Sequence, residues 1–319
     1  MKVVVTGGAG FIGSHLCDKL LQKGYEVTCI DNLSTGKKEN IQHLANNRHF
    51  SFVEGDISNY DVCSSTIKGA DYILHQAALG SVPRSINNPL PTHQANSTGF
   101  LNILWAAKEN NIKKVVYASS SSVYGDNKDL PKTESKVGTP LSPYAVTKKT
   151  NELYAKVFSE LYALPIIGLR YFNVFGERQD PNGAYAAVIP KFISALLNNQ
   201  PISIHGDGEQ MRDFTYVQNV VNANLLALES NNDTILGDVF NIACGERTTL
   251  NTLVKHLKDI ITELKPSNQN IEVNYSDPRK GDIKQSFASI EKATSLLNYS
   301  PEIFLKEGLE KVINSFAKP

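Results

Sequence analysis

The stretch Val3-Val4-Val5-Thr6-Gly7-Gly8-Ala9-Gly10-Phe11-Ile12-Gly13 decides the fold. Its first residues form a short apolar run, which is typical of a strand buried on both faces. A glycine-rich turn follows, and apolar residues then recur at helical spacing as far as Lys23. Gly7 permits a tight turn, Gly10 a close approach of the backbone to a pyrophosphate, and Gly13 close helix–strand packing. Because free N–H groups at a helix N-terminus bind phosphate, this context predicts a dinucleotide-binding unit rather than an ordinary tight turn.

Strands and helices alternate through the first half of the chain. The hydrophobic pattern predicts strands at residues 27–30, 50–53, 72–74, 114–119 and 166–171, and long helices at 93–109 and 143–162. Such alternation indicates βαβ units that share one parallel sheet. The expected fold class is therefore α/β, a Rossmann-type doubly wound parallel sheet with helices on both faces.

The regular alternation of strands and helices ends after about Phe172. We expect a helix at 189–198, a further helix and strand within 214–228 and 239–243, and a strand near 271–275. Residues 1–172 are expected to form the dinucleotide-binding domain, with 214–243 returning to it. Residues 173–213 and 244–319 are expected to form a smaller C-terminal lobe that binds the substrate.

Composition excludes several classes of protein. The chain has 319 residues, of which 41% are hydrophobic and 20% charged, as in a globular protein with a sizeable core. Thirty-two basic residues balance 32 acidic ones, so we expect no binding to nucleic acid or to an anionic membrane by charge. No uncharged apolar run approaches the roughly 20 residues of a membrane helix, and the first residues read as a strand rather than a signal peptide.

Cysteine and histidine spacing indicates the setting. Four cysteines, Cys17, Cys29, Cys63 and Cys244, are scattered along the chain, none of them at metal-ligand or redox spacing. This favours free thiols in a reducing cytoplasm. The seven histidines form no HxxxH or HxxH pair, so no metal site is expected. His75 and His93 are interpreted as structural residues.

The carboxylate that ends the second strand indicates which dinucleotide binds. Asp31 can accept hydrogen bonds from the adenosine ribose hydroxyls, and it repels a 2′-phosphate. This favours NAD over NADP, although Lys37 and Lys38 lie close by in the sequence. Asp56-Ile57 follows the third strand and can equally contact adenine or form a plain turn.

A tyrosine and a lysine four residues apart suggest acid–base chemistry. Ser142 suits a helix N-cap and Pro143 the first helical position, so Tyr144 and Lys148 share one helix face. An ammonium beside a phenol lowers its pKa, and a positively charged nicotinamide acts in the same direction. We therefore expect Tyr144 to be a general base. Alone, the pair would suit an exposed helix face, but it follows a dinucleotide fingerprint.

Together these motifs resemble the extended short-chain dehydrogenase/reductase family and, within it, the nucleotide-sugar 4-epimerases. The matching residues are Gly7 to Gly13, Asp31-Asn32, His75-Gln76-Ala77-Ala78, Ser120, Tyr144, Lys148, residues 170–176 and Arg212-Asp213-Phe214. Residues 78–85 and 178–190 are similar to the bacterial UDP-N-acetylglucosamine 4-epimerases that supply surface-polysaccharide precursors, including members that act on the uronic acids.

The resemblance implies a tightly held NAD, a UDP-sugar between the lobes and a homodimer. Tyr144 would take the proton of the 4-hydroxyl while carbon 4 gives hydride to NAD, and Lys148 would hold the nicotinamide ribose. Ser120, or its neighbour Ser121, would hydrogen-bond the 4-oxygen. The 4-keto sugar would then rotate and take the hydride back on its other face.

The resemblance also implies two sets of binding residues. The cofactor set is Gly7, Gly10, Phe11, Ile12, Gly13, Asp31, Asn32, Asp56, Ile57, Gln76, Tyr144 and Lys148. The substrate set is Gly80, Ser81, Arg84, Ser120, Ser121, Asn173, Ala187, Val188, Lys191, Arg212, Arg279 and Ser286. In it, Asn173, Arg212 and Arg279 would hold UDP. Small side chains, above all Ser286, predict room for an N-acetyl group. For the dimer, Leu101, Leu104 and Tyr154 are the expected contacts.

Other activities on the same fold stay open. The alternatives are a UDP-glucose or UDP-glucuronate 4-epimerase, a UDP-glucuronate decarboxylase and a 4-keto reductase. A 4,6-dehydratase is disfavoured, because related dehydratases carry an Asp-Glu pair where this chain has Ser121-Ser122. A non-catalytic NAD-sensing regulator would have no need of Ser120, Tyr144 and Lys148.

Overall fold

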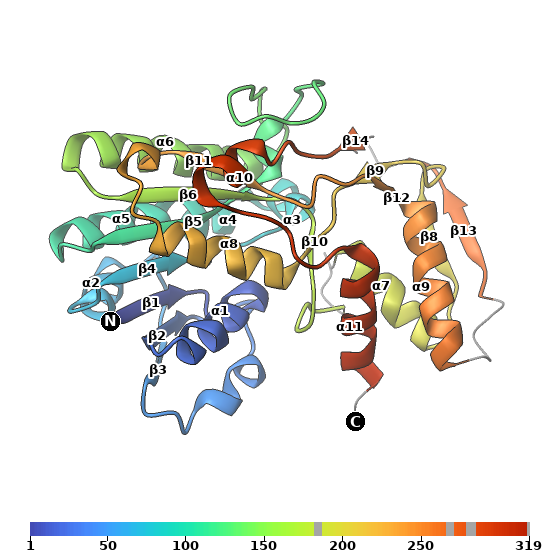
Figure 1. The fold of residues 1–319 in the computed structure, drawn as a ribbon, viewed down its shortest axis with the longest axis horizontal. Coiled ribbons are helices and arrows are strands. Elements are labelled where there is room, and N and C mark those ends of the chain that lie inside the picture. Colours follow the sequence, from blue (N-terminus) through green and yellow to red (C-terminus); the bar gives the residue numbers. More distant parts are fainter. Residues whose placement is uncertain (182–186, 266–270, 279–284, 318–319) are drawn as a thin grey trace.

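The main sheet has seven parallel strands in the order β11-β6-β5-β4-β1-β2-β3 (Figure 1). The computed structural model describes residues 1–181, 187–265, 271–278 and 285–317. The strands of this sheet are β1 (Lys2–Thr6), β2 (Glu26–Asp31), β3 (Phe50–Glu54), β4 (Tyr72–His75), β5 (Lys114–Ser120), β6 (Ile166–Tyr171) and β11 (Val239–Ile242). The chain runs outward from β1 through β2 and β3, then crosses to β4 on the other side of β1. The predicted doubly wound Rossmann-type fold is confirmed.

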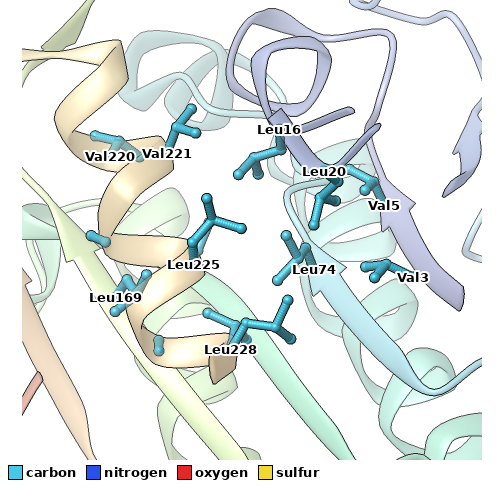
Figure 2. Packing of buried hydrophobic residues seen from close by; sticks show 14 of the residues in the cluster. Val3, Val5, Leu16, Leu20, Leu74, Leu169, Val220, Val221, Leu225 and Leu228 are labelled. Atoms are coloured by element: carbon cyan, nitrogen blue, oxygen red, sulfur yellow. The ribbon is translucent and has the colours of Figure 1, made fainter. Parts of the chain in front are cut away.

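Helices cover both faces of this sheet. They are α1 (Phe11–Gln22) and α8 (Val217–Glu229) on one face, and α2 (Tyr60–Ile67), α5 (Gly99–Glu109) and α6 (Pro143–Tyr162) on the other. Strand β1 shows why both faces are filled. Val3 and Val5 pack with Leu20 of α1 and Leu225 of α8, as Figure 2 shows, whereas Val4 joins the core on the opposite face. Alternation along the strand thus buries an unbroken apolar run.

Helix boundaries follow local signals in one case and depart from them in another. α6 spans the predicted 143–162, because Ser142 Oγ accepts a hydrogen bond from the Ala145 N–H at 3.2 Å and Pro143 starts the first turn. The helix predicted at 93–109 begins earlier, as α4 (Pro89–His93), which Asn88 caps after α3 (Val82–Asn87). A π-helical turn at Gln94–Thr98 then joins α4 to α5.

The second lobe has its own core. Helices α7 (Val188–Leu197), α9 (Leu250–Leu264) and α11 (Leu305–Ala317) pack around it, with Ile193, Leu257 and Leu309 fully buried. The remaining elements are β7 (Val174–Phe175), β8 (Ile202–His205), β9 (Met211–Arg212), β10 (Thr215–Tyr216), β12 (Thr248–Thr249), β13 (Val273–Ser276), β14 (Gln285–Ser286) and α10 (Glu291–Leu297). Strand β11 pairs with β6, so the chain does return to the main sheet. The lobe boundaries predicted from the sequence stay a prediction.

Three expectations from composition can be followed into the structure. All four cysteines are buried as free thiols. Within the described ranges, no group of three His, Cys, Asp or Glu side chains could hold a metal ion. The same part of the chain contains no helix that is long and apolar enough to cross a membrane.

Candidate active site

A cleft of about 1340 Å³ lies at the carboxyl ends of the central strands. Gly7, Asp31, Gln76, Ser120 and Tyr171 line it, and each ends or directly follows a strand of the main sheet. This edge is where open α/β sheets bind ligands. The volume exceeds the roughly 300–1,000 Å³ typical of a pocket for one small molecule, so a dinucleotide and a substrate can be held together.

The glycine-rich loop is shaped for close backbone contact. Gly7 has φ +68°, and a Cβ placed on it would lie 2.7 Å from the Ala77 backbone. A Cβ on Gly13 would lie 2.1 Å from the Gly7 carbonyl oxygen. Gly10 is the N-cap of α1, and within the described residues no side chain caps this end. The loop therefore presents backbone N–H groups and the positive end of α1 to the cleft.

Asp31 is held rigidly at the end of β2. Its Oδ2 accepts a hydrogen bond from the Ala9 N–H at 3.0 Å, and its Oδ1 accepts one from the Leu33 N–H at 2.8 Å. Burial raises the pKa of Asp31, while these backbone hydrogen bonds act against the rise. A carboxylate has about four acceptor sites, and the backbone N–H groups of Ala9, Gly10 and Leu33 use three of them, so Asp31 can still accept a bond from a ribose hydroxyl.

Asp56 forms the turn that was one of its two interpretations, and its contact with adenine stays a prediction. Its Oδ1 accepts a hydrogen bond from the Ser58 N–H at 2.8 Å, which is the geometry of a turn, and its Oδ2 accepts one from Asn32 Nδ2 at 2.9 Å. Burial raises its pKa, but the hydrogen bonds from Ser58 and Asn32 lower the pKa of Asp56 overall. Asp56, Asn32, Ile57 and Gln76 all line the cleft.

Ser120, Tyr144 and Lys148 meet on the same wall of the cleft. The Ser120 side chain hydrogen-bonds the Tyr144 phenol, and its Oγ also accepts a bond from the Ser122 N–H at 3.1 Å. Lys148 is only 2% exposed, and its Nζ donates to the Ala118 carbonyl oxygen at 2.7 Å. The end of β5 and the first turns of α6 thus bring together the three residues predicted as catalytic.

The predicted pKa shift of Tyr144 is wrong for the protein alone. Burial raises the pKa of Tyr144, and the hydrogen bond with Ser120 opposes the rise only in part. Lys148 does not lower the pKa of the phenol as expected. Its ammonium is bonded to a carbonyl, and burial lowers the pKa of Lys148 itself to about 8, against the opposing charge of Glu152.

A buried ion pair supports this wall from behind. Arg170 Nε and Nη2 donate to the two carboxylate oxygens of Glu152 at 2.7 and 2.9 Å, and Ser119 Oγ donates to the same carboxylate at 2.7 Å. Arg170 also lies over the Tyr124 ring, 4.9 Å from its centroid. The network ties β5, β6 and α6 together beside the residues predicted as catalytic.

Most of the predicted substrate residues line the same cleft. These are Gly80, Ser81, Arg84, Ser120, Ser121, Asn173, Ala187, Arg212 and Ser286. Ser286 and Arg212 face each other across the β14–β9 pairing. Val188 and Lys191 do not line the cleft. Val188 starts α7 and packs against the core of the second lobe, whereas Lys191 is exposed on the same helix. Arg279 lies outside the described residues.

Several lining residues were missed by sequence reasoning. Tyr171 ends β6, and its hydroxyl donates to Gln76 Oε1 at 3.1 Å. Its position at a strand end could have indicated it. Ser122, Arg178 and Gln179 also line the cleft. Arg178 lies in the stretch 178–190 that carried the resemblance, but its pairing with Asp18, 160 residues away in the sequence, could not be predicted.

Comparison with known proteins identifies the family. The sequence profile of the NAD dependent epimerase/dehydratase family matches residues 3–243. The chain belongs to this family. The resemblance to the extended short-chain dehydrogenase/reductases and their nucleotide-sugar 4-epimerases is thereby confirmed.

Three solved structures match this chain over nearly its whole length. A UDP-N-acetylglucosamine 4-epimerase from Methanobrevibacter ruminantium M1, in complex with UDP-N-acetylmuramic acid, is 45% identical, has a TM-score of 0.92 and covers 99% of this chain and 98% of its own. A UDP-glucose 4-epimerase from Thermotoga maritima with UDP-glucose is 39% identical (TM-score 0.91, 99% of both chains). A UDP-glucuronic acid 4-epimerase from Bacillus cereus with UDP-glucuronic acid and NAD is 36% identical (TM-score 0.90, 99% of both chains).

NAD is the cofactor of this epimerase/dehydratase family member, as predicted. The residues present fit it. A Cβ would fill the space at Gly7 and Gly13 where the backbone must come close, and the fixed carboxylate of Asp31 lies in the same cleft. An anionic Asp31 disfavours a 2′-phosphate at that end.

Proposed function

We propose that the protein is an NAD-dependent 4-epimerase of UDP-N-acetylhexosamines, including UDP-N-acetylglucosamine. The observation that carries the proposal is the meeting of Ser120, Tyr144 and Lys148 in the cleft that also holds the glycine-rich loop. The coarser statement, an NAD-dependent 4-epimerase of nucleotide sugars, is supported by the three full-length neighbours, which are all UDP-sugar 4-epimerases.

The proposed chemistry uses the two hydroxyl-bearing side chains at the 4-oxygen of the sugar. Bound NAD accepts a hydride from carbon 4 and later returns it. Ser120 positions the 4-oxygen, and Tyr144 takes its proton as the carbonyl forms. When the 4-keto sugar has turned its other face, Tyr144 gives the proton back. No net oxidation results, and the only net change is the configuration at carbon 4.

Because the pKa of Tyr144 is raised, its action as a base depends on a positive charge near its hydroxyl. A phenol kept neutral by burial is a poor base until a positive charge stabilises the phenolate. Lys148 lies in the same buried wall, one helical turn from Tyr144, but it does not lower the pKa of the phenol in the protein alone. The positively charged nicotinamide of bound NAD would supply that charge. We propose that Lys148 holds the nicotinamide ribose.

Small side chains on the substrate wall support a preference for N-acetylated sugars. Gly80, Ser81, Ala187 and Ser286 all line the cleft, and a Cβ on Gly80 would have no neighbour within 4 Å. In a 4-epimerase the sugar must be held in two orientations, so this wall must clear the bulkiest substituent in both. We propose Ser286 as the residue that admits the acetamide.

A specific observation keeps uronic acids as a second candidate substrate. The neighbour from Bacillus cereus contains UDP-glucuronic acid, and Arg84 lines the cleft of this protein. A guanidinium suits a carboxylate because it donates two parallel hydrogen bonds. The dehydratase alternative is weaker, since Ser121 and Ser122 begin the short helix Ser121–Tyr124 after β5 and offer no acid–base pair.

The test is direct incubation with three sugars. The protein is mixed separately with UDP-N-acetylglucosamine, UDP-glucose and UDP-N-acetylglucosaminuronate, and the products are separated. We expect the fastest conversion with an N-acetylated sugar. Ser286→Tyr should lose that activity through overpacking and keep or gain UDP-galactose activity. Unchanged conversion of UDP-N-acetylglucosamine by Ser286→Tyr would refute the role given to this residue.

We further propose that the protein is a cytoplasmic homodimer paired through α6. This helix exposes Val146, Leu153, Val157 and Leu161, with exposed fractions of 51%, 58%, 44% and 72%. Their spacing of seven, four and four residues puts them on one helix face, which a second copy can cover. Leu104, expected as a contact, is instead fully buried within one chain, whereas Leu101 and Tyr154 are half-buried. The proposal of a cytoplasmic location is based on the four free thiols, which are typical of a reducing compartment.

A further inference from the structure

A short segment of the second lobe is tied to the dinucleotide-binding lobe beside the cleft. This segment, residues 177–180, is called the strap. His15 Nε2 hydrogen-bonds the Glu177 carbonyl oxygen at 3.0 Å, and Arg178 Nη2 forms an ion pair with Asp18 at 2.7 Å. Lys37 Nζ forms an ion pair with Asp180 at 3.2 Å. The strap therefore joins α1 to the loop that follows Asp31.

The strap is also fixed to its own lobe. The Tyr216 hydroxyl donates to the Glu177 carboxylate at 2.7 and 2.8 Å, and Gln179 Nε2 donates to the Val174 carbonyl oxygen at 3.1 Å. Arg178 has φ +64°, a left-handed conformation that a residue with a Cβ adopts only when its surroundings enforce it. A segment anchored in both lobes holds them in one relative position.

Strap residues share the cleft with the cofactor residues. Lys37, Arg178, Gln179 and Asp180 line it together with Gly10, Phe11 and Asp31. Two polar atoms of the strap, Arg178 Nη1 and Gln179 Oε1, are buried and have no hydrogen-bond partner within the described residues. Buried polar groups normally have partners. A diphosphate supplies acceptors for a guanidinium, and ribose hydroxyls supply donors for an amide oxygen.

We propose that the strap retains NAD and that two ion pairs, Arg178–Asp18 and Lys37–Asp180, hold the strap closed. Bound NAD extends from Asp31 toward Lys148, and the strap closes the side of that path between α1 and the loop carrying Lys37. Release of the cofactor then requires that these two ion pairs break. The inference rests on the proposed function only in taking NAD as the occupant of this part of the cleft.

Of the two ion pairs, Arg178–Asp18 contributes more to holding the strap in place. Its side chains are 26% and 20% exposed, against 50% and 39% for Lys37 and Asp180. Because solvent screens exposed ion pairs, the shielded pair contributes more to retention. Asp18 has a second partner, His43 Nε2 at 2.7 Å, which holds the carboxylate in place for Arg178.

The experiment measures how fast NAD leaves the loaded protein. NAD-loaded protein without sugar is mixed with an alcohol dehydrogenase and ethanol, which reduce only NAD that is free in solution, and NADH absorbance is followed. We expect Arg178→Gln and Asp18→Asn each to release NAD about fivefold faster, or about 1 kcal/mol at 1.4 kcal/mol per tenfold. The double variant should be no faster than Arg178→Gln alone, because Asp18 acts on the strap only through Arg178. Lys37→Met and Asp180→Asn should show a smaller acceleration.

Lys23→Gln is the matched control. Lys23 pairs with Glu229 at 3.0 Å just beyond the far end of α1, and neither residue lines the cleft. We expect this variant to release NAD at the wild-type rate. Wild-type release from Arg178→Gln and Asp18→Asn, or equal acceleration by Lys23→Gln, would overturn the proposal. Because no sugar is present, this result is independent of whether the protein epimerises any given UDP-sugar.

Discussion

Tyr144 and Lys148 share one face of α6, yet burial acts on their proton affinities in opposite directions. It raises the pKa of the Tyr144 phenol and lowers that of the Lys148 ammonium to about 8. Both shifts favour the neutral side chains, as expected for groups withdrawn from water. The catalytic role proposed for the pair therefore depends on positive charge brought into the cleft, in addition to the spacing seen in the sequence.

Replacing the phenol hydroxyl tests its role as the base. Tyr144→Phe keeps the ring but removes the group that would exchange a proton with the 4-oxygen. We expect turnover to fall by about 10²–10⁴-fold, the usual contribution of a positioned general base, with little change in UDP-sugar affinity. Steady-state kinetics and a binding titration measure both. A variant that turns over at nearly the wild-type rate would mean that another group takes the proton.

The lowered pKa of Lys148 predicts a pH dependence of stability. In the unfolded chain this lysine keeps its proton to about pH 10.4, whereas in the folded protein it loses the proton near pH 8. Between these values the unfolded state binds more protons, so the free energy of unfolding rises with pH, by ~3 kcal/mol in all. Lys148→Met lacks this contribution. Denaturant unfolding at several pH values should show the wild-type advantage growing from pH 8 to 10, and a constant difference would contradict the shift.

At the scale of elements, the glycine-rich loop and α1 form one unit in which two glycines meet different surroundings. A Cβ on Gly13 would lie 2.1 Å from the Gly7 carbonyl oxygen, so the loop would have to move. Gly24 follows α1 with φ +82°, but a Cβ there would meet nothing within 4 Å. The first position is constrained by contact and the second only by backbone conformation.

The two glycines allow a matched comparison. We expect Gly13→Ala to lose bound NAD, because the displaced loop no longer presents its N–H groups to the pyrophosphate. Gly24→Ala should cost about 1 kcal/mol of stability through its left-handed backbone but keep NAD. Nucleotide content after purification and denaturant unfolding measure these effects. Equal NAD content in both variants would show that the tight loop is not required.

The elements also show what the sequence can and cannot predict. The start of α6 was predictable because Ser142 and Pro143 act within the first turn of the helix. The helix predicted from His93 begins at Pro89, since prolines are tolerated in a first turn. Contacts such as Arg178–Asp18 depend on how distant segments pack, and the pKa of Tyr144 depends on burial. Neither the contact nor the pKa can be predicted from the spacing of residues along the chain.

At the scale of the whole molecule, the exposed apolar face of α6 leads to a test of assembly. Leu153→Glu places a charge on that face, and we expect it to shift the proposed dimer toward monomer, because a buried unpaired charge is costly. Leu296→Glu, on an exposed leucine of α10, is the control and should leave the dimer intact. Sedimentation at micromolar concentration measures both. A wild-type protein that sediments only as a monomer would refute the dimer.

The central claim is that carbon 4 of the sugar loses a hydride and receives the same hydride back on its other face. The most direct measurement uses UDP-N-acetylglucosamine that carries deuterium at carbon 4, with the product analysed by mass spectrometry and NMR. We predict UDP-N-acetylgalactosamine of unchanged mass with the deuterium still at carbon 4, and no need for added NAD beyond what the protein holds. Loss of deuterium to solvent, its transfer to carbon 6 with loss of water, or an unchanged sugar would contradict the account.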